Sequence, residues 1–445
     1  MNKVPVYFVG IGGIGMSGVA QYFLALGHPV AGYDRTRTPL TDKLTLLGAQ
    51  IIYEEDVDLI PDVFTNAATT KVVYTPAIPT SSPLLAYFRE HGFTLQKRAV
   101  VIGEISKTMP CLAVAGTHGK TTTSALLTHL LRSSGKKITA FLGGIAENIG
   151  SNFLLDGQDV LVVEADEFDR SFMQLHPSAI ALTSMDADHL DIYGTHKELT
   201  EAFVAFAAKV SPDKRFVRHG LAVSGNSFGL EEGTHQVLNL QTIAGAYTFD
   251  FVTPRGTLHG LRLPYPGHHN LMNAAAAISL ALTMDCSAAD IHHGLETFKG
   301  VDRRFSMRLT HPKVLVDDYA HHPTEINAVY DALTAFYPQQ RKLAVFQPHL
   351  FSRTRDFADS FKEALASFDE LLLLDIYPAR ELPIDGVNSA MLLTETHGSH
   401  QLVSKDELAQ KVVASSADIV AVMGAGDIAF EVDKIVESLK KDADA

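Results

Sequence analysis

The chain has 445 residues, of which 46% are hydrophobic and 20% are charged, and this composition is that of a globular protein with substantial cores and not of a disordered or fibrous one. A chain of this length exceeds one compact core, so we expect three domains. The 37 basic and 51 acidic residues give a net charge of −14, which argues against a nucleic-acid binder because such proteins need a basic face.

The N-terminus leads directly into a β-type apolar run at residues 4–9, without a long apolar signal segment, and no stretch of the sequence has the length of a membrane span. We therefore expect a cytoplasmic protein with no membrane partner. Cys111 and Cys286 do not form a C-x-x-C pair, so we expect small buried residues and neither a disulfide framework nor a thiolate zinc site.

The first glycine-rich motif follows the apolar run and reads Gly10-Ile-Gly-Gly-Ile-Gly-Met-Ser-Gly. A helical stretch to about Leu26 and a second strand at residues 29–33 complete a βαβ unit that ends at Asp34. Glycines at this spacing let the backbone approach the diphosphate of NAD or of a UDP-sugar, and Asp34 would bind a ribose or sugar hydroxyl in either case. Residues 71–78 predict a later strand of the same sheet, with Thr75 and Ala77 at its ligand-binding edge.

A second loop, at residues 115–123, reads Ala-Gly-Thr-His-Gly-Lys-Thr-Thr-Thr and lies between an apolar run and leucines at helical spacing. Its backbone N–H groups and the helix N-terminus would bind phosphates, Lys120 would add a positive charge, and Thr121 would offer a hydroxyl to Mg²⁺. The usual pattern has glycine where Val114 stands, but the order of strand, loop and helix, with Gly135 where the helix would end, supports the assignment. The sequence therefore predicts an ATP site.

The middle of the chain places acidic and imidazole groups after apolar runs that suit buried parallel strands. Glu164 ends one such run and, with Thr121, offers the oxygen ligands that Mg²⁺ prefers. His189, in Asp188-His-Leu-Asp, is a candidate for a second metal or for the reacting carboxyl group, although lone histidines are usually structural and the neighbouring aspartates could equally form a solvated acidic loop. Residues 215–265 predict a small antiparallel addition.

Two pairs of polar residues follow. Asn270 and Asn273 lie three residues apart at a predicted helix start, where their amides could bind an adenine edge or simply cap the helix. Arg303 and Arg304 follow a Gly-Val-Asp turn and could bind phosphate or form a solvated basic pair.

The last third predicts another α/β unit, with strands at 314–319, 342–347, 371–376 and 419–423 and helices that begin at Pro323 and near Thr354. Side chains that suit anionic substrate groups follow two of these strands: Tyr319, His321, His322, His349, Arg353 and Arg355. Adjacent side chains on an extended backbone point in opposite directions, so His321 and His322 are not expected to form a zinc pair.

In their order along the chain these motifs resemble those of the Mur ligases, and within that family the branch that adds L-alanine to UDP-N-acetylmuramate. The residues of this resemblance are the two glycine-rich loops and Glu164-Ala-Asp-Glu, Asp188-His-Leu-Asp, His269-Asn-x-x-Asn, Arg303-Arg-Phe, Asp317-Asp-Tyr-Ala-His-His-Pro-Thr-Glu and Gln347-Pro-His. The resemblance implies ATP and Mg²⁺ as cofactors, an acyl phosphate intermediate and a role in peptidoglycan precursor synthesis. We expect a monomer or a weak homodimer.

The resemblance also implies a three-domain α/β fold. A Rossmann-like N-terminal domain at residues 1–107 would bind the UDP-sugar, a central P-loop ATPase domain with a mostly parallel sheet would cover residues 108–303, and a C-terminal Rossmann-like domain would cover residues 304–445.

The site residues implied by the resemblance fall into four groups. The catalytic group is Lys120, His189, His321 and Arg353. The metal ligands are Thr121, Glu164 and His189. The ATP-binding group is Gly116, Thr117, His118, Gly119, Lys120, Thr121, Thr122, His269, Asn270, Asn273, Arg304 and Asp317. The UDP-sugar group is Gly12, Gly13, Ile14, Gly15, Met16, Ser17, Asp34, Thr75, Ala77, Arg170, Ser171 and Tyr319.

Two positions depart from the family pattern. Several Mur ligases have a carbamoylated lysine shortly after the Asp-His motif, but the equivalent position here is Phe203, with Lys197 and Lys209 out of register, so we expect no such modification. Members often have Arg after the histidine of Gln-Pro-His, where this chain has Leu350.

Several other functions fit part of the sequence. A nicotinamide oxidoreductase would use the first ninety residues but would leave the ATP loop and the last third without a role. A nucleotide-dependent switch would not need the C-terminal histidines and arginines. Within the ligases the murein-tripeptide recycling enzyme is the nearest alternative and folylpolyglutamate synthase a distant one. The run from Gln347 to Thr354 favours the alanine-adding branch.

Overall fold

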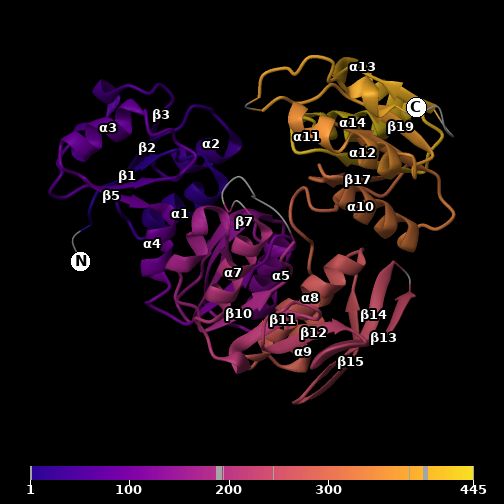
Figure 1. Ribbon diagram of the computed structural model, residues 1–445, viewed down its shortest axis with the longest axis horizontal. Helices are drawn as coiled ribbons and strands as arrows, with labels where there is room; N and C mark the ends of the chain where they lie inside the picture. Colours follow the sequence, from indigo (N-terminus) through magenta and orange to yellow (C-terminus); the bar gives the residue numbers. More distant parts are fainter. Residues whose placement is uncertain are drawn as a thin grey trace. The chain divides into compact units, whose positions relative to one another are not determined.

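The computed structural model describes residues 3–186, 193, 195–243, 245–379, 381–393 and 399–443. The strands form three mostly parallel sheets, each with its own helices (Figure 1). The chain divides into two compact units, one of Met1–Leu240, Thr248–Arg262 and Met272–Lys299 and the other of Gln241–Tyr247, Leu263–Leu271 and Gly300–Ala445. The predicted three-domain α/β class is confirmed, while the boundaries after residues 107 and 303 remain predictions.

The first sheet has the strand order β3-β2-β1-β4-β5, with all neighbours parallel. Its strands are β1 (Val6–Val9), β2 (Val30–Tyr33), β3 (Gln50–Ile52), β4 (Lys71–Tyr74) and β5 (Thr94–Lys97), and its helices are α1 (Ile14–Ala25), α2 (Pro39–Leu46), α3 (Pro83–Glu90) and α4 (Arg98–Ile105). Because β2 and β4 flank β1, the strand order reverses at β1, and ligands of open α/β sheets bind at such a point. The loop after β1 is the first glycine-rich motif.

The second sheet has ten strands in the order β15-β14-β13-β12-β11-β10-β6-β9-β7-β8. Strand β6 (Cys111–Ala115) lies between β9 (Val160–Ala165) and β10 (Ala179–Leu182) and is parallel to both. Strand β6 leads through the second glycine-rich loop into α5 (Lys120–Ser133), whose end is marked by Gly135 at φ 78°. The order of strand, loop and helix predicted from the sequence is therefore present.

The remaining elements of this part follow in chain order: β7 (Ile138–Ala146), β8 (Ser151–Leu155), α7 (His196–Ala207), β11 (Arg215–Arg218), β12 (Asn226–Leu230), β13 (His235–Ile243), β14 (Ala246–Thr253), β15 (Gly256–Leu263), α8 (His268–Leu282) and α9 (Ala288–Glu296). The prediction of a small antiparallel addition at residues 215–265 is wrong for β11 and β12. Strands β11, β12 and β13 instead extend the central sheet, with β10–β11, β11–β12 and β12–β13 all parallel. Strands β11 and β12 have only four and five residues, so the sequence pattern did not indicate how they pair.

The third sheet has the order β16-β17-β21-β18-β19-β20 and is parallel except for the pair β16–β17. Its strands are β16 (Ser306–Leu309), β17 (Val314–Asp318), β18 (Lys342–Phe346), β19 (Glu370–Leu373), β20 (Ser399–Leu402) and β21 (Ile419–Met423). Helices α10 (Pro323–Phe336) and α12 (Ala358–Leu365) pack into the core on one face, and α13 (Lys405–Ala414) and α14 (Ala429–Ala443) pack into the core on the other (Figure 1). The sheet is therefore covered on both faces, as in doubly wound folds.

The helix predicted from near Thr354 begins earlier, as α11 (Phe351–Asp356), and Leu350 precedes it at φ 74°. A hydrophobic core is continuous from α1 and β1 through α4 to β6, β9 and β10. Among the described residues, no helix is both long enough and apolar enough to cross a bilayer.

Candidate functional site

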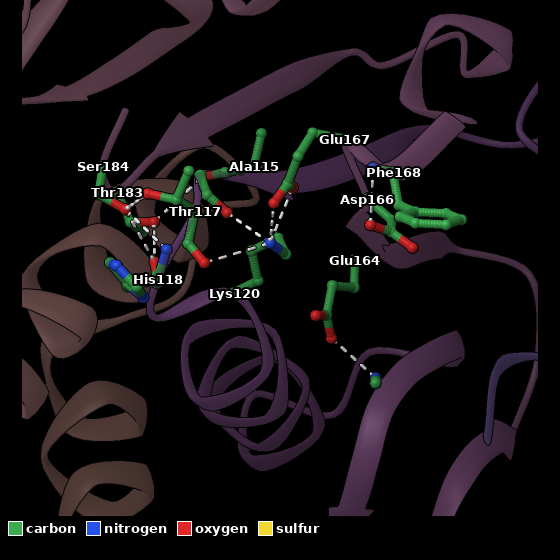
Figure 2. Close-up of polar contacts among 12 residues, drawn as sticks. Ala115, Thr117, His118, Lys120, Glu164, Asp166, Glu167, Phe168, Thr183 and Ser184 are labelled. Atoms are coloured by element: carbon green, nitrogen blue, oxygen red, sulfur yellow. Dashed lines mark hydrogen bonds and ion pairs between the residues drawn. The ribbon is translucent and has the colours of Figure 1, made fainter. Parts of the chain in front are cut away.

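The second glycine-rich loop is held in place by the two residues that follow β10. The Ser184 hydroxyl accepts the His118 N–H at 2.7 Å and lies 2.9 Å from the Thr117 hydroxyl, and the Thr183 hydroxyl donates to the carbonyl oxygens of Ala115 and His118 (Figure 2). Strands β6 and β10 are neighbours, so the sheet itself brings these hydroxyls to the loop. The loop is thus held in one conformation, of the kind in which backbone N–H groups can bind phosphate.

Two positions in this loop require glycine. Gly116 has φ 136°, and a Cβ atom there would lie 2.2 Å from Thr183 Oγ1. Gly119, the N-cap of α5, has φ 81°, and a Cβ atom there would lie 2.3 Å from Asn273 Oδ1. The structure therefore brings Asn273, a predicted adenine contact, directly against the predicted phosphate loop.

Lys120 extends back across the loop. Its Nζ donates to the carbonyl oxygen of Gly116 at 2.6 Å and to the Glu167 carboxylate, whose two oxygens lie at 2.9 and 2.8 Å (Figure 2). The Lys120 side chain is 13% exposed and that of Glu167 is fully buried. A cation held by these contacts therefore lies at the predicted phosphate loop.

Thr121 and Glu164 form the predicted pair of oxygen ligands. The Thr121 hydroxyl lies 3.0 Å from both carboxylate oxygens of Glu164, and the Gly143 N–H donates to Oε2 at 2.8 Å. Burial raises the pKa of Glu164, although nearby Lys120 and these hydrogen bonds act in the opposite direction. A hydroxyl and a carboxylate side by side at a phosphate loop are the donors that Mg²⁺ takes together with phosphate oxygens.

The first glycine-rich loop is closed by Asp34. Its Oδ2 accepts the Gly12 N–H at 2.7 Å and its Oδ1 accepts the Thr36 N–H at 3.1 Å. The predicted contact of Asp34 with a sugar hydroxyl remains a prediction, but the structure adds a second task, which is to fix the loop. Thr75 lies across from this loop, since a Cβ atom on Gly10 would be 3.0 Å from Thr75 Cγ2.

Arg98, at the start of α4, lies over Gly15 in the first turn of α1. A Cβ atom on Gly15 would be 2.1 Å from Arg98 Nη1, and Arg98 Nη2 lies 3.5 Å from Asp166 of the Glu164-Ala-Asp-Glu motif. A guanidinium and the N-terminus of α1 are thus together, which suits a diphosphate.

A cluster of aromatic, imidazole and guanidinium groups lies at the edge of the third sheet. The guanidinium carbons of Arg303 and Arg304 lie 5.2 and 5.3 Å from the ring centre of Tyr319, and His321 packs edge-on against Tyr319 at 5.2 Å. His349 lies 5.9 Å from His321 and stacks on Tyr377.

The two adjacent histidines, His321 and His322, have different neighbours, and only His321 belongs to this cluster. His322 caps α10 and packs against Phe357, away from His321. Burial lowers the pKa of the His321 imidazole, and the nearby positive charges of Arg353 and Arg304 lower it further, while Glu325 acts in the opposite direction. His321 therefore tends to be the neutral base at neutral pH.

A buried carboxylate, Asp317, and a partly buried one, Asp318, precede this cluster. Burial raises the pKa of Asp317 to about 6, and Arg303 Nε lies 3.5 Å from its Oδ1. Burial likewise raises the pKa of Asp318 to about 6, although its carboxylate accepts the N–H groups of Phe305 and Ala320, both at 2.7 Å. Asp318 therefore shapes the turn that presents Tyr319.

Other predicted residues are placed as follows. Ile14, Met16 and Ser17 lie in the first turns of α1, where the Ser17 hydroxyl donates to the Ile14 carbonyl oxygen. Arg170 lies over the Tyr193 ring, 5.5 Å from its centre, next to Ser171. Asn270 donates to the Pro266 carbonyl oxygen at 2.7 Å. His189 lies outside the described residues. The predicted ATP-binding residues His269, Asn270, Arg304 and Asp317 belong to the second compact unit, and the others to the first.

The two positions that depart from the family pattern, Phe203 and Leu350, lie in different surroundings. Phe203 is fully buried and packs edge-on against Phe172, with 5.5 Å between ring centres, so its position is part of the core. Leu350 has φ 74°, which is unfavourable for a bulky side chain, and its N–H donates to the Tyr377 carbonyl oxygen at 3.0 Å.

Sequence reasoning missed three residues that touch the predicted site: Gly143, Glu167 and Arg98. Gly143 opens a Gly-Gly pair inside the apolar run of β7, which was an available signal for close approach of another group. Glu167 stands three residues after Glu164, and its contact with Lys120 had no signal in the sequence.

Three family models match the chain in order: Mur ligase family, catalytic domain at residues 5–109, Mur ligase middle domain at residues 114–281, and Mur ligase, glutamate ligase domain at residues 303–426. The chain belongs to the Mur ligase family. A relative from Christiangramia forsetii, named UDP-N-acetylmuramate--L-alanine ligase, is 50% identical, and the alignment covers 98% of each chain. A relative of the same name from Flavobacterium psychrophilum is 49% identical over 100% of this chain and 99% of its own.

Solved structures of Mur ligases share the fold. UDP-N-acetylmuramate-alanine ligase MurC from Thermotoga maritima has a TM-score of 0.84 at 27% identity, with 98% of this chain and 99% of the other covered. A murein peptide ligase from Psychrobacter arcticus has a TM-score of 0.67 at 20% identity, with 98% of each chain covered, and so shares the fold.

Proposed function

We propose that this Mur ligase joins L-alanine to the carboxylate of UDP-N-acetylmuramate and converts ATP to ADP and phosphate, in peptidoglycan precursor synthesis. The full-length relatives named for this reaction support the substrates. The reaction would take place in the cytoplasm, where ATP is available, with the enzyme as a monomer or weak homodimer.

The structural observation that supports the proposal most directly is the preformed phosphate loop, with the Lys120 ammonium on one side and the Thr121 hydroxyl and Glu164 carboxylate on the other. Phosphoryl transfer depends mainly on positioning and on neutralising charge, and needs little covalent help from the protein. These groups supply both.

The chemistry explains why ATP is needed. A carboxylate is a poor electrophile because oxide is a poor leaving group. A carboxylate oxygen of the sugar attacks the γ-phosphorus, the bond to ADP breaks, and an acyl phosphate forms. The nitrogen of the free amine of L-alanine then attacks the acyl carbon, phosphate leaves, the amide forms, and the nitrogen loses its proton.

The donor set fits Mg²⁺, since Thr121 and Glu164 offer hard oxygen ligands and a bound cation would favour the charged form of the Glu164 carboxylate, whose pKa is raised by burial. Mg²⁺ would neutralise charge on the phosphates. The resemblance to the family adds His189 for a second Mg²⁺. Lys120 would bind the phosphates, and Asn270 and Asn273 the adenine.

The other two parts of the chain would bind the substrates. Residues 1–107 would hold the UDP-sugar on the first glycine-rich loop, where Arg98 lies over Gly15. Residues 304–445 would present Tyr319, His321 and Arg353 to the sugar and the amino acid. His321 is our candidate for the group that takes the proton from the amine, because its surroundings favour the neutral imidazole.

The proposal is tested by measuring phosphate release with MgATP and UDP-N-acetylmuramate in the presence of L-alanine, L-serine, glycine or the murein tripeptide. Release that requires both the sugar nucleotide and L-alanine is the expected result. Release with the tripeptide instead would assign the chain to the recycling branch, whose fold it shares.

A further inference from the structure

The Glu167 carboxylate contacts the phosphate-loop lysine from the side opposite to the loop. Its two oxygens lie 2.9 and 2.8 Å from Lys120 Nζ, and the Glu167 side chain has no exposed surface. Figure 2 shows Glu167 directed at Lys120 from the segment after β9, whereas Glu164 points away from Lys120 toward β7. Two acidic residues of one motif therefore have different partners.

The backbone around Glu167 is fixed by several independent contacts. The Glu167 carbonyl oxygen accepts the Arg170 N–H at 2.9 Å and the hydroxyl of buried Tyr193 at 2.6 Å. Asp169 and Arg170 both have φ 54°, in the left-handed region that side chains rarely adopt. Lys97 holds Asp169 by an ion pair of 2.6 Å.

Such strain persists only where the surroundings impose it, and it concentrates at functional sites. Two successive left-handed residues two and three positions after Glu167 make the chain turn sharply, and the turn leaves Glu167 pointing inward at the loop. A buried ion pair is by itself weak evidence for a stabilising role, because desolvation offsets the attraction. Stability therefore does not explain why the Lys120–Glu167 pair lies at the predicted phosphate loop.

The contacts of Lys120 supply that reason. A lysine ammonium is a point charge on a flexible stem, so its direction depends on what it touches. Lys120 Nζ donates to the Gly116 carbonyl oxygen on the side of the loop and to the Glu167 carboxylate on the buried side. These two contacts fix Nζ between them. The Glu167 carboxylate has no exposed surface, so it cannot move with Lys120 toward solvent. If Lys120 moved away, the buried negative charge of Glu167 would be left without its ion-pair partner.

We propose that Glu167 is a positioning residue of the ligase reaction, which holds the Lys120 ammonium at the γ-phosphate while the backbone N–H groups of the loop bind the rest of the nucleotide. The proposal rests on the proposed function. It separates two tasks of the loop: nucleotide affinity comes mainly from the backbone and the N-terminus of α5, and rate comes from a lysine held in one place.

The test uses the full-length chain with Glu167→Gln, which keeps the size of the side chain and removes its charge, and Glu167→Asp, which keeps the charge and shortens the reach. Glu431→Gln is a matched control, because Glu431 is also buried, at 6% exposed, and also contacts a lysine, Lys434, through both oxygens at 3.0 Å, but on the C-terminal helix α14. For each variant, kcat and KM are measured by phosphate release, ADP binding by calorimetry and folding by thermal unfolding.

We expect Glu167→Gln to lower kcat at least about tenfold while the Kd for ADP and the KM values for sugar nucleotide and L-alanine stay within about threefold. Glu167→Asp should retain more activity than Glu167→Gln, and Glu431→Gln should match the wild type. The calorimetric stoichiometry gives the concentration of folded sites, so kcat is expressed per folded site.

A kcat of Glu167→Gln within about threefold of the wild type would overturn the proposal, and so would a kcat and an ADP affinity that fall in parallel. Either result leaves the wild-type reaction intact. A wild-type protein that releases no phosphate with both co-substrates would instead refute the proposed function and, with it, this inference.

Discussion

Gly143→Ala tests the placement of the Glu164 carboxylate without replacing any ionisable residue. A Cβ atom on Gly143 would lie 2.3 Å from Glu164 Oε2, 2.7 Å from its Cδ and 2.8 Å from its Oε1. The obstacle is the far end of a flexible side chain, so the carboxylate can retreat while the backbone stays in place. To reach an ordinary contact of 3.4 Å, it must move by about 1.1 Å.

A displacement of about 1 Å in a reacting array can cost about a hundredfold in rate, which corresponds to about 2.7 kcal/mol of transition-state stabilisation. We therefore expect Gly143→Ala to lower kcat about a hundredfold, with little change in thermal stability, because Gly143 is exposed and its backbone is not in the left-handed region. The assay is phosphate release at saturating substrates, paired with thermal unfolding.

Gly157→Ala serves as the matched control, because it is expected to lower stability and leave kcat unchanged. A Cβ atom there would lie 2.6 Å from the Cβ atom of Lys137, which cannot rotate away, so the backbone must shift. This variant should lose about 1–3 kcal/mol of stability and keep its kcat. A kcat of Gly143→Ala within about threefold of the wild type, or a larger loss of stability than in Gly157→Ala, would refute the reasoning.

Three further predictions follow from other parts of the molecule. Lys120→Ala should abolish acyl phosphate formation and leave binding of UDP-N-acetylmuramate nearly unchanged in calorimetry, and loss of both would contradict the division of tasks between the two glycine-rich loops. Gly15→Ala should raise the KM for UDP-N-acetylmuramate in steady-state assays, because a Cβ atom there would lie 2.1 Å from Arg98 Nη1, and an unchanged KM would exclude Arg98 from the diphosphate site. Burial lowers the pKa of His235, which lies 2.8 Å from the Ser279 hydroxyl, from 6.5 to about 4, so below pH 6.5 the unfolded state gains a proton that the folded state does not. His235 should therefore contribute a loss of about 2 kcal/mol of stability between about pH 7.5 and about pH 5, seen in urea unfolding as the pH-dependent difference between the wild type and His235→Gln.

Local patterns were enough to predict the strand, loop and helix around the second glycine-rich motif. An apolar strand, glycines at 116 and 119 and leucines at helical spacing follow one another between residues 111 and 131, and the φ values of 136° and 81° at the two glycines are those that favour glycine in a tight loop. Glu164 was also predictable, because a carboxylate at the end of a buried strand must lie at the edge of the sheet where parallel strands end.

Contacts between distant segments were not predictable in the same way. Gly143 meets Glu164 only because β7 pairs with β9, and Arg98 meets Gly15 only because α4 packs beside α1. Glu167 depends on two left-handed residues that no sequence signal marked, since neither Asp169 nor Arg170 is glycine. The short strands β11 and β12 gave a pattern that fits parallel and antiparallel pairing alike, and the prediction chose the wrong one.

The central claim is that this Mur ligase uses ATP to join L-alanine to UDP-N-acetylmuramate. The most direct measurement is phosphate release from MgATP with the sugar nucleotide and L-alanine together, compared with each alone and with L-serine, glycine or the murein tripeptide in place of alanine. Release is expected only when the sugar nucleotide and L-alanine are both present, with the amide product formed in equal amount. Phosphate release that does not depend on the sugar nucleotide, or that requires the tripeptide, would contradict the proposed reaction.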